Sequence, residues 1–369
     1  MNPLKHRATL WDKLHIDLPL LLALLVLLGA SVLIVFSAGG QEMPIVYRQL
    51  KRMGVALIIM LVLAQVPPST LQRFVIPFYC IGLVLLVAVL VSGITINGSQ
   101  RWLSIGITRI QPSEIMKLMV PMMVAWYIGK YHLPPKMKHL FVGFILVMLP
   151  TILIQRQPDL GTSLLVASSG IFVLFLAGVS WRLIGGLTAV GAISAWPLWT
   201  YGMHAYQKQR VLTLFNPESD PLGAGYHIIQ SKIAIGSGGL EGKGWLHGTQ
   251  SQLEFLPERH TDFIFSVLSE EFGLVGVTLL LAAYLFIIAR GLFIAVNAQD
   301  AFGKLLAGSL TLTFFVYLFV NIGMVSGLLP VVGVPLPLIS YGGTSMVTLL
   351  AGFGMIMSIA THKRILVHT

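Results

Sequence analysis

The sequence predicts an all-α membrane protein, a polytopic bundle of about ten transmembrane helices with one long extracytoplasmic loop. Of its 369 residues, 56% are hydrophobic and only 10% are charged, whereas soluble domains carry about 25% charged residues. Apolar runs of roughly 20 residues recur along the chain, and each is long enough to span a bilayer. The sequence lacks the alternation of polar and apolar residues that is typical of an outer-membrane barrel.

Ten apolar segments follow one another in order. The first lacks a small-residue cleavage site, so we interpret it as a retained helix rather than a signal peptide. Pro112 and Ser113 are typical helix-start residues and begin the fourth segment. The turn sequence Pro158-Asp159-Leu160-Gly161 separates the fifth segment from the sixth. The predicted spans are 18–38, 47–66, 73–94, 113–130, 139–156, 161–179, 182–201, 263–290, 304–328 and 338–361.

The basic residues predict the orientation of these spans. An even number of spans puts both termini on one side of the membrane. The short segments on that side carry twelve Lys and Arg residues, against six on the opposite side. Because cytoplasmic segments are enriched in Lys and Arg, we expect both termini to be cytoplasmic.

A long polar loop, residues 202–262, is inserted within what we otherwise predict to be a single domain, 1–369. It holds 6 of the 14 acidic residues and 9 of the 37 glycines, and it ends at Asp262, where the eighth span begins. Long segments cross the membrane largely regardless of charge, so we expect this loop outside. Residues 226–235 could form a helix in the headgroup region, and the glycines of 236–244 predict a sharply turning backbone.

Two charged residues occur where charges are costly. Glu114 and Lys117 lie at the start of the fourth span, three residues apart, so they share one face of a helix. Ionisable residues inside spans generally pair with one another and serve function. A purely structural ion pair is the alternative, and we favour a functional pair in an outward-facing cavity.

Further polar residues lie on the same outer side. Asp159 either caps the sixth span or serves the site, because Pro-Asp is good turn and cap chemistry. Arg48, Lys51 and Arg52 lie near the start of the second span. A guanidinium group matches phosphate oxygens bidentately, so we favour a pyrophosphate-binding role for Arg48. For Lys51 we favour a position facing lipid headgroups.

Other features argue against several classes of site. The net charge is +10, but without a dense Lys/Arg run it indicates topology and anionic lipid rather than nucleic acid. The single cysteine, Cys80, allows no intramolecular disulfide, and neither CxxC nor HExxH is present to support a zinc site. The Gly236–Gly244 stretch fails the Walker pattern, so it is not predicted to bind phosphate.

The C-terminal motifs provide a resemblance to a known family. Between Asn321 and Ser345 the chain carries Gly327, Pro330, Gly333, Pro335-Leu-Pro337 and Ser340-Tyr-Gly-Gly-Thr-Ser345. This pattern closely resembles the signature of the SEDS proteins (shape, elongation, division and sporulation). The ordered motifs Gln111-Pro-Ser-Glu114, Gln157-Pro-Asp159, Asn216-Pro-Glu218 and the Asp262 segment are similar too. The resemblance covers essentially the whole chain, and residues 250–262 look more like the rod-shape member than the division member.

The resemblance implies a peptidoglycan glycosyltransferase that polymerises lipid II during cell elongation. It would act at the outer leaflet of the bacterial inner membrane, with the 202–262 loop in the periplasm. The family's candidate catalytic aspartate corresponds to Asp262. We expect substrate binding by Glu114, Lys117, Asp159, Arg48, Arg210, Ser340, Gly342 and Gly343. The implied partners are a class B penicillin-binding protein, which is a transpeptidase, and the elongation machinery.

Glycan polymerisation needs a base for the acceptor hydroxyl and a stabilised pyrophosphate leaving group. Asp262, at the membrane edge, is placed to be the general base. The donor sugar is α-linked and the polymer β-linked, so a single inverting displacement suffices. Lys117, Arg48 or a divalent cation such as Mg²⁺ or Mn²⁺ could offset the charge on the leaving group. The alternatives are a lipid II flippase and a non-catalytic scaffold that activates the penicillin-binding protein.

Overall fold

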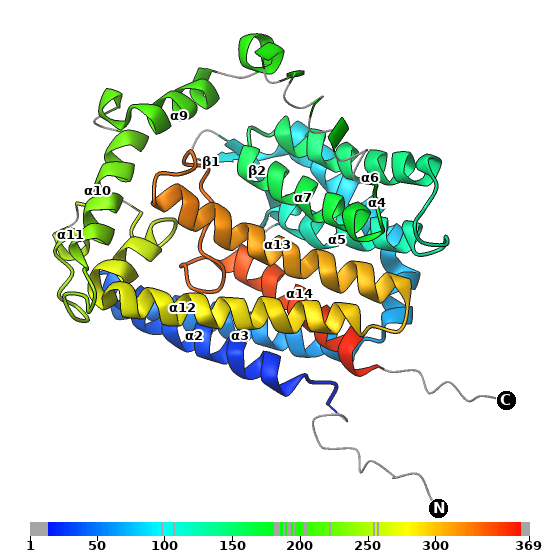
Figure 1. The fold of residues 1–369 in the computed structure, drawn as a ribbon, viewed down its shortest axis with the longest axis horizontal. Helices are drawn as coiled ribbons and strands as arrows, with labels where there is room; N and C mark the ends of the chain where they lie inside the picture. Colours follow the sequence, from blue (N-terminus) through cyan, green and yellow to red (C-terminus); the bar gives the residue numbers. More distant parts are fainter. Residues whose placement is uncertain are drawn as a thin grey trace, which may run out of the picture.

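The protein is a bundle of long helices in the computed structural model (Figure 1). The structure describes residues 14–362 apart from 97–98, 106–107, 181–184, 187–188, 190–192, 195, 203–204, 221–222, 254 and 257. The long helices are α2 (Leu18–Ala38), α3 (Met43–Gln65), α4 (Pro68–Ser92), α5 (Pro112–Ile128), α6 (Met137–Gln155), α7 (Leu160–Leu176), α12 (Ile264–Val296), α13 (Ala301–Val325) and α14 (Gly343–Thr361).

These helices coincide with all the predicted spans except the seventh, 182–201, of which the structure describes only separate pieces. Within the described part of the chain, six helices are long and apolar enough to cross a membrane: α2, α4, α6, α12, α13 and α14. Helix α3 carries three basic residues, and α5 and α7 have 17 residues each. The predicted helical membrane architecture is therefore confirmed.

Aspartate side chains begin three of the helices. Asp17, Asp159 and Asp300 precede α2, α7 and α13, and each carboxylate accepts a hydrogen bond from a backbone N–H of the first turn, at 3.1 Å. Such caps satisfy amide groups that have no partner within the helix.

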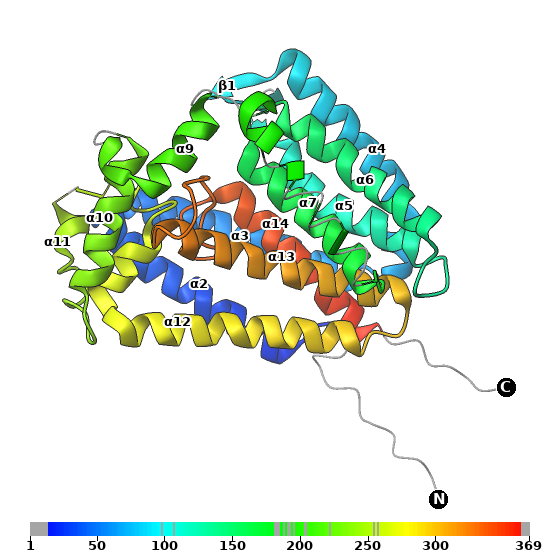
Figure 2. The same ribbon diagram turned by 45° about the horizontal axis from the view of Figure 1, so that its top comes forward.

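The two ends of the bundle are formed by different segments of the chain. At one end the start of α2 meets the end of α12, where Arg290 donates to Asp17 at 2.7 Å. The rings of His15 and His362 stack there at 3.7 Å, so the two ends of the described chain lie together (Figure 1). At the other end Ser37 donates to Glu271, and the long loop gathers beside them (Figure 2). The first and last described residues thus lie at the end of the bundle opposite the long loop.

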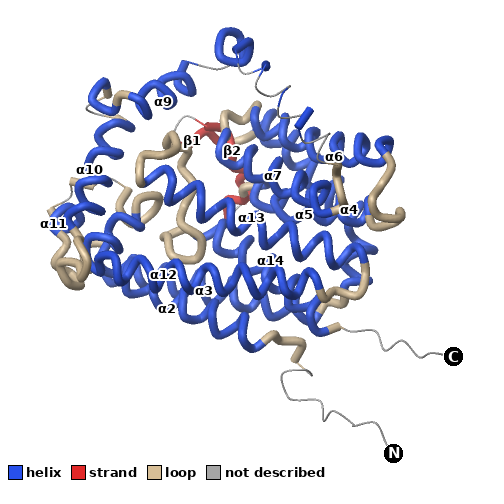
Figure 3. The backbone as a smooth tube through the Cα atoms, in the orientation of Figure 1, coloured by secondary structure: helices blue, strands red, loops and turns tan. Residues whose placement is uncertain are grey.

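A small antiparallel sheet was not expected from the sequence. It consists of β1 (Ile94–Ile96), β2 (Ser99–Ile105) and β3 (Thr108–Ile110), in the order β1-β2-β3, and Figure 3 shows it beside the helices. Isoleucine and threonine favour strands, and the Asn97-Gly98 sequence between β1 and β2 is a recognised hairpin signal. The treatment of 95–111 as a simple short loop therefore overlooked a local signal.

The long loop contains short helices. They are α9 (Ala205–Phe215), a 3₁₀ turn (Pro217–Ser219), α10 (Ala224–Ser237) and α11 (Thr249–Gln252), and a π-helical turn (Leu198–Gly202) leads into the loop from the predicted seventh span. Helix α10 confirms the helix predicted over 226–235. Figures 1 and 2 show α9 and α10 reaching past the end of α13.

The glycine-rich segment after α10 packs into a break in α12. Gly273 has a φ of +59°, which interrupts the helix and leaves neighbouring backbone groups without helical partners. The loop supplies those partners: Leu274 and Val275 donate to the carbonyls of Gly239 and Leu240, at 3.0 and 3.1 Å. Lys243 and Gly244 donate in return to the carbonyls of Glu270 and Glu271, both at 3.0 Å. We call this contact, between residues 239–244 and 270–275, the loop clasp.

Candidate functional site

One polar cavity of about 230 Å³ brings together four of the nine predicted site residues, Glu114, Lys117, Asp262 and Gly342. It lies where β2, α5, α7, α13 and the start of α14 converge on the segment that precedes α12. Its lining includes Arg101, Gln111, Glu114, Lys117, Thr162, Thr261, Asp262, Tyr317, Gly333, Tyr341, Gly342, Thr344 and Ser345. Sequence segments that are far apart therefore meet at a single site.

Three consecutive carbonyl groups hold Asp262 in place. The carbonyl of His260 accepts a hydrogen bond from the backbone N–H of Tyr341 at 2.8 Å. That of Thr261 accepts from the Ser340 hydroxyl at 2.6 Å, and that of Asp262 accepts from the Asn321 amide at 2.8 Å. Because α13 and the segment before α14 supply these donors, the backbone at Asp262 is fixed by the rigid bundle.

The Asp262 carboxyl is partly open to the cavity. Desolvation by burial, with a smaller contribution from the nearby Glu258 carboxylate, raises the pKa of Asp262 to about 6. The positive charges of Arg101 and Arg210 lower the same pKa and so limit the shift. A carboxyl with a perturbed pKa in a cleft is a candidate acid or base.

Glu114 and Lys117 form the predicted pair in the first turns of α5. The Lys117 ammonium donates to Glu114 Oε1 at 2.7 Å, and their side chains are 5% and 11% exposed. The second carboxylate oxygen, Glu114 Oε2, is buried without a hydrogen-bond partner among the described residues. Both side chains line the cavity with Asp262, which supports a functional role over a purely structural one.

Asp159 serves the site indirectly. One of its oxygens caps α7 by accepting from the N–H of Thr162 at 3.1 Å. The other lies 3.4 Å from Arg101 Nη1 and 3.4 Å from the amide nitrogen of Gln111. The sequence left open whether Asp159 caps a helix or serves the site. The two roles are compatible, because the capping carboxylate also contacts Arg101 and Gln111, which line the cavity.

Sequence reasoning missed Arg101 as a site residue. It projects from β2 and lines the cavity, and its charge acts on Asp262. The Arg101 side chain remains 33% exposed while it pairs with Asp159, and it lines the cavity, where an anionic ligand could reach it. Recognition of the hairpin signal would have identified Arg101 as an ordered residue rather than one of several loop charges.

The other predicted arginines lie differently. Arg48 is exposed on α3 and does not line the cavity. Arg52, one turn further on, lies over the ring of Tyr341, with its Cζ 4.6 Å from the ring centroid. Arg210 projects from α9, half-buried, and its charge acts on Asp262. Among the three basic residues of α3, Arg52 therefore lies next to the cavity. The sequence favoured Arg48 for that position.

The predicted residues of the C-terminal motif divide into two roles. Gly342 lines the cavity, and a Cβ at Gly343 would lie 3.1 Å from Arg52. Ser340 is buried, and its hydroxyl accepts from Leu336 N–H at 2.8 Å while it donates to Thr261. Ser340 therefore supports the Asp262 segment instead of lining the cavity.

A divalent cation at the pyrophosphate was an expectation from the sequence. In the described part of the chain, no group of three or more His, Cys, Asp or Glu side chains is arranged to hold a metal ion. Glu114 and Asp159 already face Lys117 and Arg101. These residues do not fit a metal site built by the protein itself, so the mechanism is derived without a metal ion.

Comparisons with known proteins identify the family of this chain. Residues 11–365 match the family of cell cycle proteins that comprises FtsW, RodA and SpoVE. The chain belongs to the FtsW/RodA/SpoVE family. Among its relatives, it is 58% identical over 365 residues to the peptidoglycan glycosyltransferase MrdB of Escherichia coli strain K12, covering 99% of this chain and 98% of that protein.

Two solved structures extend the match to three dimensions. One, from work on the structural coordination of polymerization and crosslinking by a peptidoglycan synthase complex, has a TM-score of 0.82 at 32% identity, covering 94% of this chain and 99% of that one. The rod shape determining protein RodA of Thermus thermophilus has a TM-score of 0.71 at 28% identity, covering 93% and 96%. The SEDS resemblance inferred from the motifs is confirmed.

Proposed function

We propose that this protein is a peptidoglycan glycosyltransferase that polymerises lipid II, with Asp262 as the general base. The observation that carries the proposal is the single cavity that holds a carboxyl of raised pKa beside two cations, Lys117 and Arg101. A base with a pKa near 6 is mostly ionised at neutral pH, yet it is basic enough to accept a proton in the transition state.

The reaction is a single displacement at the anomeric carbon of the donor sugar. The acceptor hydroxyl gives its proton to the Asp262 carboxylate as its oxygen attacks the anomeric carbon. The bond from that carbon to the pyrophosphate oxygen breaks, and its electron pair leaves with the polyprenyl pyrophosphate. Attack from the face opposite the leaving group converts the α-linkage into a β-linkage, so one base suffices and no covalent intermediate forms.

Cations in the cavity would stabilise the negative charge that develops on the pyrophosphate. Lys117 is held by Glu114, and Arg101 is held by Asp159, so both charges are positioned before substrate arrives. Preorganised donors of this kind stabilise a transition state without reorganisation during the reaction. Asp159 and Glu114 are in this proposal the groups that orient the two cations.

The proposed setting is the bacterial inner membrane, with both termini in the cytoplasm and the cavity facing the outer leaflet. A class B penicillin-binding protein and the elongation machinery are the proposed partners. The similarity to a chain from a peptidoglycan synthase complex supports such a partnership. The sequence itself lacks the Ser-x-x-Lys and accompanying motifs of a transpeptidase, so a second protein would have to crosslink the strands.

Purified protein supplied with lipid II tests the proposal. The Asp262→Asn variant keeps size and hydrogen bonding but loses basicity, so polymerisation should fall on the order of 100- to 10,000-fold. Asp17→Asn is the matched control, because Asp17 pairs with Arg290 at the opposite end of the bundle. Normal polymer from well-folded Asp262→Asn would falsify the role of this residue. Leaflet exchange of lipid II without polymer would favour the flippase.

A further inference from the structure

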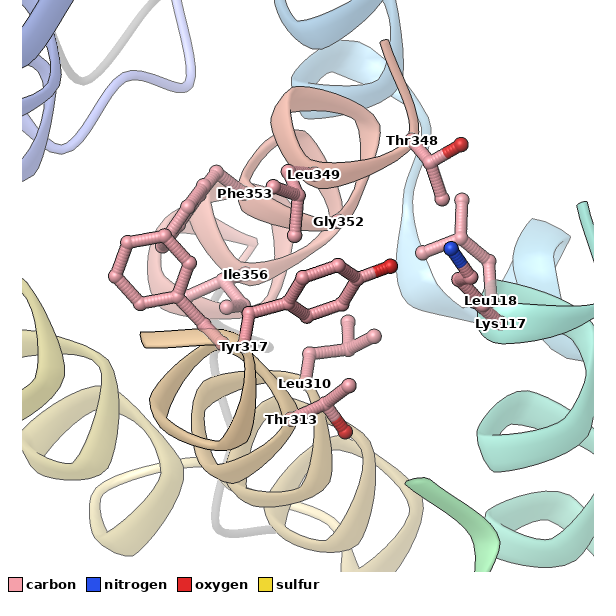
Figure 4. A pocket seen from close by; sticks show the side chains of 11 residues that line it. Lys117, Leu118, Leu310, Thr313, Tyr317, Thr348, Leu349, Gly352, Phe353 and Ile356 are labelled. Carbon is pink, nitrogen blue, oxygen red and sulfur yellow. The ribbon is translucent and has the colours of Figure 1, made fainter. Parts of the chain in front are cut away.

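A tyrosine hydroxyl that lines the cavity makes no hydrogen bond shorter than 3.5 Å within the described part of the chain. Tyr317, on α13, is 1% exposed, and its buried hydroxyl has no partner within that distance among the described residues, although the Lys117 ammonium lies near enough to interact with it. The ring lines the polar cavity, and it also lines a second, mostly apolar cavity of about 30 Å³ between α5, α13 and α14. Figure 4 shows the hydroxyl pointing away from α13, toward the side of the small cavity where Lys117 lies.

Other buried tyrosines of this chain are satisfied. Tyr284, fully buried on α12, donates to the carbonyl of Pro337 at 2.6 Å, and Tyr79 donates to that of Leu146 at 2.6 Å. Burial of a hydroxyl without a hydrogen bond is unfavourable, and buried polar groups in native proteins are nearly all paired. The Tyr317 hydroxyl is therefore an exception that calls for a ligand or a water molecule.

The surroundings of this hydroxyl favour an anionic oxygen. The Lys117 ammonium lies 5.1 Å from the centroid of the Tyr317 ring, and one of its N–H groups donates a hydrogen bond to Glu114 Oε1. An ammonium has three donors, so further donors remain for a group between Lys117 and Tyr317. An ammonium and a phenolic O–H that face one polar cavity together match the oxygen of a phosphate.

We propose that the Tyr317 hydroxyl binds a phosphate oxygen of the lipid-linked donor, beside Lys117. The inference deepens the proposed function and rests on it for the identity of the donor. Tyr317 keeps its proton throughout and only donates a hydrogen bond. This bond strengthens as the bond between the anomeric carbon and the pyrophosphate oxygen breaks, because negative charge then accumulates on the phosphate.

The test compares Tyr317→Phe with Tyr284→Phe. The first substitution removes the unpaired hydroxyl and keeps the ring that lies beside Lys117. The second removes a hydroxyl of equal burial whose partner is a backbone carbonyl outside the cavity lining. Binding of farnesyl pyrophosphate and of farnesol to detergent-purified full-length protein is measured by thermal shift, and melting temperatures without ligand are recorded.

Tyr317→Phe should bind farnesyl pyrophosphate about tenfold more weakly than the unmodified protein, because a hydrogen bond to a charged group is lost. Binding of farnesol should stay the same, and the melting temperature without ligand should be unchanged or higher. Tyr284→Phe should show a lower melting temperature and unchanged binding of farnesyl pyrophosphate. Opposite effects on stability and binding distinguish a ligand contact from a structural one.

Equal binding of farnesyl pyrophosphate by Tyr317→Phe and the unmodified protein would overturn the inference. That result would mean that water satisfies the hydroxyl, since a cavity of this size can hold one. An equal loss of farnesol binding would also overturn it, because the hydroxyl would then act through packing. Lipid II polymerisation by the unmodified protein tests the proposed function separately. The role of the Tyr317 hydroxyl and the proposed function can therefore fail independently.

Discussion

At the scale of single residues, the charge balance around Asp262 predicts the pH dependence of the reaction. The base must be ionised, and the pKa of Asp262 is about 6, so the rate at saturating substrate should fall as the pH drops through about 6. Glu258→Gln removes a charge that raises this pKa, and the acidic limb should move to lower pH. Arg101→Gln removes a charge that lowers it, and the limb should move to higher pH. If the two substitutions moved the acidic limb of the pH–rate profile in the same direction, this electrostatic explanation would be contradicted.

The pair of Glu114 and Lys117 should behave as one unit. Removal of one partner of a buried ion pair leaves an uncompensated charge, at a cost of roughly 3–5 kcal/mol. Glu114→Gln and Lys117→Met should each impair polymerisation, and the double variant should lose much less than the sum of the two. The effects are measured as a double-mutant cycle on activity and on melting temperature.

A second, partly buried pair provides the control for that cycle. Arg290 and Asp17 lie 2.7 Å apart at the end of the bundle where the described chain begins and ends. Asp17→Asn should lower the melting temperature but leave the activity of the folded fraction unchanged. Strict additivity for Glu114 and Lys117 would show that the two residues act independently.

The sequence predicted the central residues of the site better than its periphery. Asp262, Glu114 and Lys117 could be found because each places a charge at the edge of an apolar segment, which is rare enough to be informative. Tyr317 gave no such signal, since a tyrosine within a span is ordinarily a packing residue. The choice between Arg48 and Arg52 depended on helix rotation: Arg52 borders the face of α3 that buries Gln49 and Met53, and Arg48 is turned toward the exposed side.

At the scale of elements, the loop clasp should be the most sensitive part of the long loop. Gly242 has a φ of +81°, and a Cβ there would lie 2.2 Å from the carbonyl oxygen of Glu271. Gly242→Ala should therefore cost more than the roughly 1–2 kcal/mol of a left-handed alanine alone. We expect faster hydrogen exchange in residues 239–244 and 270–275, together with lower activity, because only the first residues of α12, 264–269, separate the clasp from Asp262.

Gly236→Ala is the matched control for this prediction. Gly236 lies within α10, and nothing lies within 4 Å of the Cβ position. Alanine favours a helix by about 1 kcal/mol over glycine, so this variant should be neutral or more stable. Equal destabilisation by the two substitutions would show that the clasp has no special role.

Elements with a strong local pattern were predictable, and those fixed by distant contacts were not. Long apolar runs gave α2 to α7 and α12 to α14, because bilayer thickness sets their length. The expected sharp turns occur at Gly239, Gly242 and Gly244, which have positive φ. Gly236 was wrongly included, because it lies within α10. The partner of the turning segment is a break at Gly273, and nothing in the loop sequence identifies that site. The ordered hairpin that carries Arg101 was the one element whose local signal was present but overlooked.

At the scale of the whole molecule, the two ends of the bundle have separate tasks. One end holds the stacked rings of His15 and His362, near the ends of the described chain, and the ion pair of Asp17 and Arg290. The other end gathers the long loop, the small sheet and the polar cavity (Figure 1). If the protein polymerises an outward-facing lipid-linked substrate, the cavity end must face away from the cytoplasm.

Cysteine labelling can establish this orientation directly. In a background in which Cys80→Ala removes the single native thiol, Glu241→Cys places a thiol at an exposed position of the long loop. It should react with a membrane-impermeant maleimide in intact spheroplasts. Gln299→Cys, exposed between α12 and α13 at the end where the described chain begins and ends, should react only after the cells are opened. The reverse pattern would put the cavity on the cytoplasmic side, where polymerisation at the outer leaflet could not occur.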